Sequence, residues 1–131
     1  MTTADVGTTL VGIWDAHLTF TDGPRRGEHE RLRWTFLADG VIVGTDAEGG
    51  DLPPAVGKWT VRGDGFSYWL NAVRNNPVGR PMTIVYGHAE GTLATDGHAL
   101  TVTGGSEIYG GSGDLLATNR ADVHATRIKA A

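Results

Sequence analysis

The chain has 131 residues, of which 40% are hydrophobic and 20% charged, a size and composition typical of one globular domain. Its 11 lysine and arginine residues against 15 acidic ones give a net charge of −4, which argues against nucleic acid as a partner. Because the chain has no cysteine, disulfides, thiolate metal sites and cysteine nucleophiles are excluded.

The start of the chain, Met1 to Asp5, has no basic segment followed by an apolar one. No run approaches the roughly 18 apolar residues that a membrane-spanning helix needs. We therefore expect a cytoplasmic protein with no membrane partner. Residues 1–131 should form one domain, with 1–8 as a flexible segment ahead of the fold.

Tight turns recur along the chain. Twenty glycines, about twice the usual share, favour many strands joined by turns over a helical fold. Asp-Gly pairs beginning at Asp39, Asp64 and Asp96 each lie between apolar runs and predict hairpins, because both residues tolerate positive φ. Longer connections rich in Gly, Pro and Arg alternate with these turns, at 21–27, 47–54, 74–81 and 110–114.

This alternation predicts the architecture. In an up-and-down antiparallel sheet successive turns lie at opposite ends, so all tight turns fall at one end and all long loops at the other. We predict an all-β domain, a single antiparallel up-and-down barrel of about eight strands closed at one end by the Asp-Gly hairpins. Such a barrel either fills with side chains or holds one small ligand. The expected strands are 9–20, 28–37, 41–46, 55–62, 66–73, 82–93, 98–109 and 115–128.

A period of two identifies the inner face of most strands. Every second residue from Leu10 to Phe20 is apolar or glycine, and so is every second one from Leu32 to Phe36. In the last strand every second residue from Leu115 to Ala125 is also apolar, except Asn119, and the small residues of this inward set leave room in the lumen.

Two strands are less clear, because 66–70 is apolar on both faces and 85–93 can take either register if a bulge intervenes. Our preferred inward set is Phe66, Tyr68, Leu70, Val85, Gly87, Ala89 and Leu93. That choice leaves Trp69, Met82, Ile84 and Tyr86 outside, either as an apolar patch that would support a homodimer or as scattered surface residues.

Gly12-Ile13-Trp14 at the head of the first strand and Arg127 near the end of the last resemble the pairing that marks the calycins, the lipocalin and avidin group. In that group the tryptophan closes the barrel floor and a basic residue packs across it. The resemblance therefore implies structural roles for Gly12, Trp14 and Arg127, with a cation–π contact between the last two. A second such tripeptide, Gly57-Lys58-Trp59, fits the all-β prediction and a packing role.

Residues 103–113, Thr-Gly-Gly-Ser-Glu-Ile-Tyr-Gly-Gly-Ser-Gly, are similar to the Gly-Gly-Thr/Ser-Gly-x-Tyr/Phe stretch of allene oxide cyclase and dirigent barrels. The departure is Glu107, where those families usually carry glycine. The group includes small bacterial cyclases of polyketide biosynthesis, which fold a linear substrate for ring closure without a cofactor. The resemblance implies such a cofactor-free activity.

The histidines do not form a ligand set in the predicted barrel. His17, His29 and His124 fall on the outer face, His98 lies beside a tight turn, and only His88 is undecided. The chain has no His-Glu-x-x-His, no phosphate loop and no dinucleotide fingerprint. No serine lies in a nucleophile elbow. We therefore expect no metal, no cofactor and no serine hydrolase.

Glu30 shares the parity of Leu32 and Trp34, which places its carboxyl inside the mouth of the predicted barrel. Desolvation there would raise the pKa of Glu30 and make it a usable acid or base near neutrality. Alternatively, the strand begins after Glu30, which then lies in solvent, or Glu30 pairs with an arginine of the mouth loops. The candidates for that pairing are Arg25, Arg26, Arg74 and Arg80.

Asn119 and Tyr68 are the other polar residues of inward parity. A buried amide and phenol need partners, which a hydrogen bond within the protein or a ligand carbonyl or hydroxyl would supply. Together with Glu30 they form the predicted catalytic set. The predicted apolar ligand-binding wall consists of Leu18, Phe20, Trp34 and Leu70.

Two classes of function fit this barrel. The first is a cofactor-free cyclase or isomerase of polyketide-like secondary metabolism, in which the lumen freezes a flexible, mostly apolar substrate into a reactive conformer. Glu30 would act as acid, base or hydrogen-bond donor, and Tyr68 or Asn119 would polarise a carbonyl. The alternative is a lipocalin-like carrier that binds an apolar ligand without changing it. Since lipocalin carriers are typically secreted, we favour the enzyme; a filled barrel would instead be an interaction module.

Overall fold

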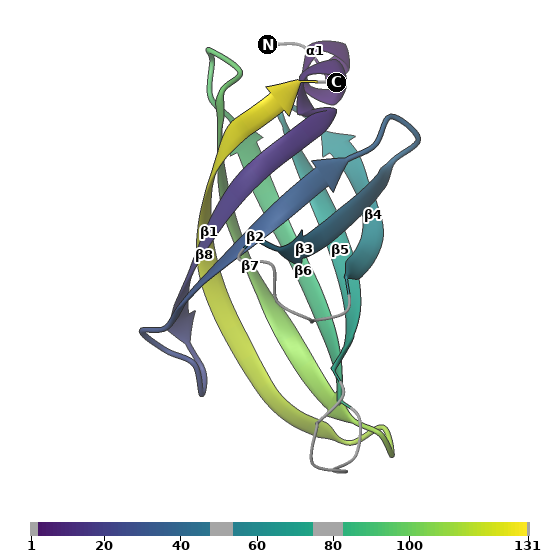
Figure 1. The fold of residues 1–131 in the computed structure, drawn as a ribbon, viewed down its shortest axis with the longest axis vertical. Coiled ribbons are helices and arrows are strands. Elements are labelled where there is room, and N and C mark those ends of the chain that lie inside the picture. The colour runs from purple at the N-terminus through teal and green to yellow at the C-terminus, as the bar shows by residue number, and fades with distance from the viewer. Residues whose placement is uncertain (1–2, 48–53, 75–82, 131) are drawn as a thin grey trace.

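The computed structural model describes residues 3–47, 54–74 and 83–130 (Figure 1). Eight antiparallel strands form one closed barrel in which each strand pairs with the next along the chain and β8 pairs with β1. This confirms the predicted all-β, up-and-down barrel. The strands are β1 (Gly12–Asp22), β2 (His29–Phe36), β3 (Val41–Asp46), β4 (Ala55–Arg62), β5 (Gly65–Arg74), β6 (Thr83–Leu93), β7 (Ala99–Gly110) and β8 (Leu115–Ala130).

The tight turns gather at one end of the barrel, at the top of Figure 1, and the β1–β2 and β7–β8 connections lie at the other end. Gly40 and Gly97, the glycines of two of the Asp-Gly pairs, have φ values of 89° and 76°, whereas in the turn at Asp64 the positive φ, 58°, falls on the preceding Gly63. Glycine takes this left-handed conformation without the steric cost that a Cβ would impose. The turn chemistry therefore explains why each of these connections reverses the chain so sharply.

A short helix, α1 (Thr3–Leu10), precedes the barrel and lies at its tight-turn end (Figure 1). The prediction of a strand from residue 9 is wrong at this point, since β1 begins at Gly12. Leu10 is indeed buried, but as a helix residue, and Val6 one turn earlier is buried with it. Of the segment 1–8 expected to be flexible, residues 3–8 belong to this helix, and residues 1–2 lie outside the described part.

Large side chains fill the half of the barrel next to α1. Trp14, Phe36, Ile42, Phe66 and Leu100 are all 2% exposed or less. The rings of Phe36 and Phe66 meet edge to face with centroids 5.8 Å apart. Trp14 also has the contact expected from the sequence, with the guanidinium carbon of Arg127 4.2 Å from its ring centroid. This end of the lumen is a packed core and leaves no room for a ligand.

Strand β6 pairs with β5 and β7 in unbroken register, so no bulge changes its faces. The preferred inward set for β5 and β6 is buried or half-buried, as predicted. A bulge occurs instead in the β7–β8 pair, next to Tyr109, and it overturns the inward assignment of Leu115. Leu115 pairs with Tyr109 and is 56% exposed.

Trp69 and Ile84 are exposed on the outer wall, with Tyr86 half-buried between them. Met82, the fourth residue expected in this patch, lies outside the described residues. No helix in the described part of the chain is long and apolar enough to cross a membrane.

Candidate functional site

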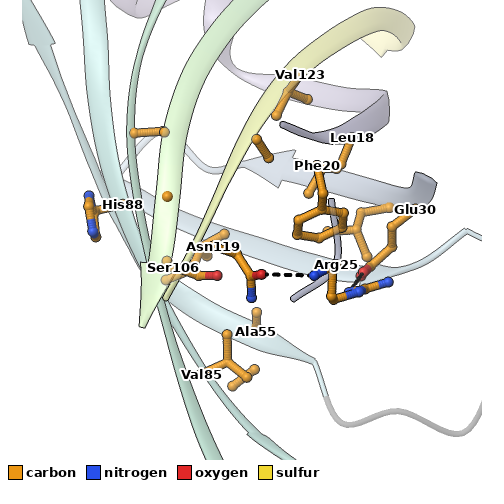
Figure 2. A pocket seen from close by; sticks show the side chains of 18 of the residues that line it. Leu18, Phe20, Arg25, Glu30, Ala55, Val85, His88, Ser106, Asn119 and Val123 are labelled. Atoms are coloured by element: carbon orange, nitrogen blue, oxygen red, sulfur yellow. Dashed lines mark hydrogen bonds and ion pairs between the residues drawn. The ribbon is translucent and has the colours of Figure 1, made fainter. Parts of the chain in front are cut away.

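The half of the barrel toward the long connections is hollow and holds a cavity of about 470 Å³ (Figure 2). That volume lies in the range of small-molecule sites, which are mostly apolar with a few polar groups. The wall fits this composition, and all four residues predicted to form it are on it. The apolar lining includes Leu18, Phe20, Leu32, Trp34, Leu70, Ala72, Val85, Ile108 and Val123.

Small inward residues keep this half of the lumen open. Ala72, Gly87, Gly104 and Ala121 occupy inner positions of β5, β6, β7 and β8 along the cavity. A Cβ on Gly104 would lie only 2.4 Å from the Cβ of Ala89 on the neighbouring strand, so that wall also depends on glycine for its close packing. The barrel is therefore filled at the floor because the inward side chains there are large, and open at the mouth because many of those there are small.

Glu30 lies on the cavity wall and is ion-paired. Arg25, in the β1–β2 connection, donates from Nη1 to Glu30 Oε2 at 2.7 Å and from Nε to Glu28 Oε1 at 3.2 Å. Of the alternatives that the sequence leaves open, pairing with a mouth arginine is the one observed. Burial alone would lower the pKa of Arg25, but the hydrogen bonds and charges of Glu30 and Glu28 outweigh it and raise the pKa.

The same arginine ties the connection to two other elements. Its guanidinium carbon lies 4.2 Å from the ring centroid of Phe20, and its backbone N–H donates to Asn119 Oδ1 at 3.3 Å (Figure 2). Asn119, on β8, is only 4% exposed. Arg25 and its partners therefore form a fixed polar rim at the mouth, and the Asn119 carbonyl already has a partner within the protein.

Trp34 and Tyr68 supply unused donors deeper on the wall. Trp34 Nε1 is buried and has no hydrogen-bond partner among the described residues. The Tyr68 hydroxyl makes no hydrogen bond to another described residue either, and burial raises the pKa of Tyr68 far above its ordinary value, so it remains a neutral donor. The two rings meet edge to face with centroids 5.2 Å apart. A buried donor without a partner is costly, which makes Trp34 Nε1 the atom at which a ligand acceptor gains most, with the Tyr68 hydroxyl as a neutral donor beside it.

Ser106 and Arg25 are lining residues that carry polar groups and were not assigned to the site from the sequence. Ser106, on β7, pairs with Asn119 and faces the cavity, as Figure 2 shows. Its parity with buried Val102 would have identified it. Arg25 was considered only as a partner for Glu30, because its approach to Phe20 and Asn119 depends on a loop conformation that strand periodicity does not contain.

The histidines form no cluster at the cavity: His17 and His124 pair with each other across β1 and β8, and both are exposed on the outer face. His88 Nε2 is 2.7 Å from Glu107 Oε2, and the ring lies on the outer side of the wall (Figure 2). His29 Nδ1 is 3.3 Å from Thr19 Oγ1 on the outer face. In the described ranges no group of three His, Cys, Asp or Glu residues is placed to hold a metal ion.

No protein-family model matches this chain, and no curated protein matches it in sequence. The functional argument therefore depends on the geometry of the cavity: an apolar chamber, an ion-paired polar rim at its mouth, and two unused donors on its inner wall.

Proposed function

We propose that the cavity binds one mostly apolar small molecule, which enters between the long connections and places a hydrogen-bond acceptor against Trp34 and Tyr68. The observation that carries this proposal is the unpartnered, buried Nε1 of Trp34 on the wall of a cavity of about 470 Å³. Because Nε1 itself is buried, this binding mode requires the Trp34 ring to shift toward the cavity, where a ligand carbonyl or hydroxyl oxygen would satisfy the donor that the fold leaves without a partner.

On this binding mode rests a catalytic proposal: the protein is a cofactor-free cyclase or isomerase that acts in the cytoplasm on a flexible, polyketide-like substrate. The wall would hold the chain folded with its reacting parts in contact, which removes much of the entropic barrier to ring closure. Trp34 Nε1–H and the Tyr68 hydroxyl would draw electron density from a carbonyl, as donors in an oxyanion hole do. The ion-paired carboxylate of Glu30 would accept a proton from the substrate, or a hydrogen bond from a ligand hydroxyl. Asn119 would position Arg25.

The second candidate is a carrier that releases its ligand unchanged. One observation favours it: Glu30 and Asn119 are both already bonded to Arg25, so the polar rim is satisfied without a substrate. Both candidates are compatible with a calycin-type barrel, an affiliation that we propose from the floor formed by Trp14 and Arg127.

The test is to incubate the protein with linear unsaturated ketones, to follow binding by tryptophan fluorescence, and to analyse the recovered ligand by mass spectrometry and NMR. A product of unchanged mass with a new ring, formed more slowly by Glu30→Gln and Trp34→Phe, would support the cyclase. Saturable binding with unchanged ligand would favour the carrier.

Gly87→Val is the matched control for the cavity itself. A Cβ at Gly87, on the inner face of β6, has only the carbonyl oxygens of Leu70 and Gly105 nearby, both at 4.0 Å, so the larger side chain occupies cavity space without displacing backbone. Binding should fall in this variant while the fold persists. Equal binding by Gly87→Val and the wild type would contradict both candidates, because the ligand would then lie outside the cavity.

A further inference from the structure

Three rings form a continuous surface on the outer wall of the barrel, across β5 and β6. Trp69 and Tyr86 have centroids 6.4 Å apart and planes inclined by 25°, and Tyr86 and His88 have centroids 5.7 Å apart and planes inclined by 37°. These separations exceed that of face-to-face stacked rings, so the rings are displaced sideways and leave ring faces uncovered. We call these three residues the outer platform.

The platform is fixed at one end by a hydrogen bond. Glu107, on β7, lies 2.7 Å from His88 Nε2, with side chains 28% and 43% exposed respectively. Next to it, Gly105 has no side chain: a Cβ there would lie 3.8 Å from His88 Cε1 and 3.7 Å from Arg120 Nη1. The absence of a side chain at Gly105 lets the Asn119 carbonyl oxygen, 2.9 Å from that Cβ position, approach closely, with the His88 ring and the Arg120 guanidinium on either side.

The platform lies in a broad surface depression shared by β4 to β8. Around it, hydroxyl side chains such as those of Ser67 and Thr103 alternate with charged ones. The charges balance, and Arg62 and Glu90 approach each other to 3.7 Å. The lining of the depression includes the basic Lys58, Arg62 and Arg120 and the acidic Asp64 and Glu90, and the acidic Glu107 lies beside it, bonded to His88.

We propose that the outer platform is a second ligand site and that it binds a neutral carbohydrate ring. One face of a pyranose is a row of C–H groups, which packs on aromatic faces, whereas its edge carries hydroxyls that bond well to carboxylates and guanidinium groups. A rim with equal numbers of acidic and basic side chains gives no net attraction to an anion or a cation. Trp69 and Tyr86 line the outer depression and not the cavity, whereas His88 borders both, so a ligand stacked on Trp69 and Tyr86 lies outside the cavity and does not depend on the function proposed for it.

The experiment is an NMR titration of the isotope-labelled full chain with cellotriose and with chitotriose, monitored at the tryptophan indole signals. We expect a saturable shift of the Trp69 indole signal with at least one sugar. Trp69→Thr and Tyr86→Thr should each reduce the affinity at least tenfold, and Glu107→Gln should reduce it less. Threonine preserves β-strand propensity at both positions.

Ile84→Thr is the matched control, because Ile84 is exposed on the same face of β6 but is not part of the platform. The control should bind as the wild type does, and ligand binding in the inner cavity should be unchanged in all variants. No shift with either sugar, or an equal loss in Ile84→Thr, would overturn the proposal. Sedimentation showing a dimer that Trp69→Thr dissociates would also overturn it, because the platform would then be a contact between two copies.

Discussion

The guanidinium carbon of Arg127 lies 4.2 Å from the ring centroid of Trp14, and the same guanidinium bonds to three backbone carbonyls. Nε donates to Gly97 O and Nη1 to Val11 O, each at 3.3 Å, and Nη2 donates to Thr9 O. One side chain of β8 therefore joins the end of α1, the start of β1 and the β6–β7 turn. It closes the floor from outside the packed core.

Arg127→Ala should lower the free energy of unfolding by roughly 3–5 kcal/mol, because charge-assisted hydrogen bonds and a cation–π contact are lost together. Arg127→Lys should cost about half of that, since an ammonium group retains the charge but cannot reach all three carbonyls in the planar geometry of arginine. Urea denaturation measures both. The control is Arg33→Ala on exposed β2 surface, expected within about 0.5 kcal/mol of wild type. Equal costs for the alanine variants of Arg127 and Arg33 would contradict the role of Arg127.

The ion pair of Asp15 makes the stability of the fold depend on pH. Burial would raise the pKa of Asp15, but the hydrogen bonds and charges of Arg31 and His17 outweigh that effect and lower it from the ordinary value of 3.8. A carboxyl whose pKa is depressed in the folded state stabilises the fold above its unfolded pKa, and this stabilisation is lost as the pH falls through the folded value. Asp15→Asn should therefore be less stable than wild type at neutral pH, and the difference should shrink below about pH 4.

Urea midpoints of the two proteins across pH 2–7, compared at low and high salt, are the measurement. Salt should reduce the neutral-pH difference, because Arg31 is about half exposed. A stability difference between wild type and Asp15→Asn that stays constant from neutral to acid pH would show that the ion pair contributes nothing.

Most of the barrel is predictable from the sequence because the features that determine it involve residues close together in the chain. Strand period and Asp-Gly turns specify the faces and the order of the strands, and both are visible in the residues themselves. Helix α1 is not predictable in this way, since it is short and contains Gly7 and several threonines, which are weak helix formers. Its stability comes from burying Val6 and Leu10 against the barrel, and that is a tertiary effect.

In the candidate site, too, the residues on strands are predictable from the sequence and the residue in a connection is not. Inward parity places Glu30, Tyr68 and Asn119 on one cavity wall, as the structure does. Parity does not place Arg25, because the turn before β2 depends on Gly23 and Gly27 at φ of 95° and 88°. Glu30 is therefore ion-paired and not isolated because of Arg25, which lies in the β1–β2 connection, where strand periodicity gives no information.

Gly57 tests the register of β4 and β5. A Cβ at this position would lie 1.6 Å from the carbonyl oxygen of Trp69, so Gly57→Ala forces two strands apart. We expect a loss of more than about 3 kcal/mol, or failure to fold, as thermal denaturation would show. Gly110→Ala is the control, because its Cβ would meet only the Leu116 side chain, at 3.5 Å, and it should be neutral. A Gly57→Ala protein that melts like wild type would contradict the pairing of Gly57 with Leu70.

The indole N–H groups of Trp34 and Trp14 differ in a way that stability measurements can resolve. Trp14 Nε1 donates to Leu10 O at 2.9 Å, whereas Trp34 Nε1 has no partner in the described part of the chain. Replacing Trp14 by phenylalanine removes a satisfied donor and leaves a buried carbonyl unpaired, which should cost about 2–4 kcal/mol. Replacing Trp34 removes a buried donor that has no partner and so destabilises the fold, and this gain offsets the free energy lost with the apolar contacts of the indole ring.

We therefore expect Trp34→Phe to unfold within about 1 kcal/mol of wild type, while it binds an acceptor-bearing ligand of the cavity roughly tenfold more weakly. Urea denaturation and fluorescence titration of the same preparations measure the two effects. The opposite pattern, a large loss of stability with unchanged affinity, would show that Trp34 is a packing residue of the floor and that the ligand acceptor lies elsewhere on the wall. A loss of both would show that ring volume, and not the N–H group alone, matters at this position.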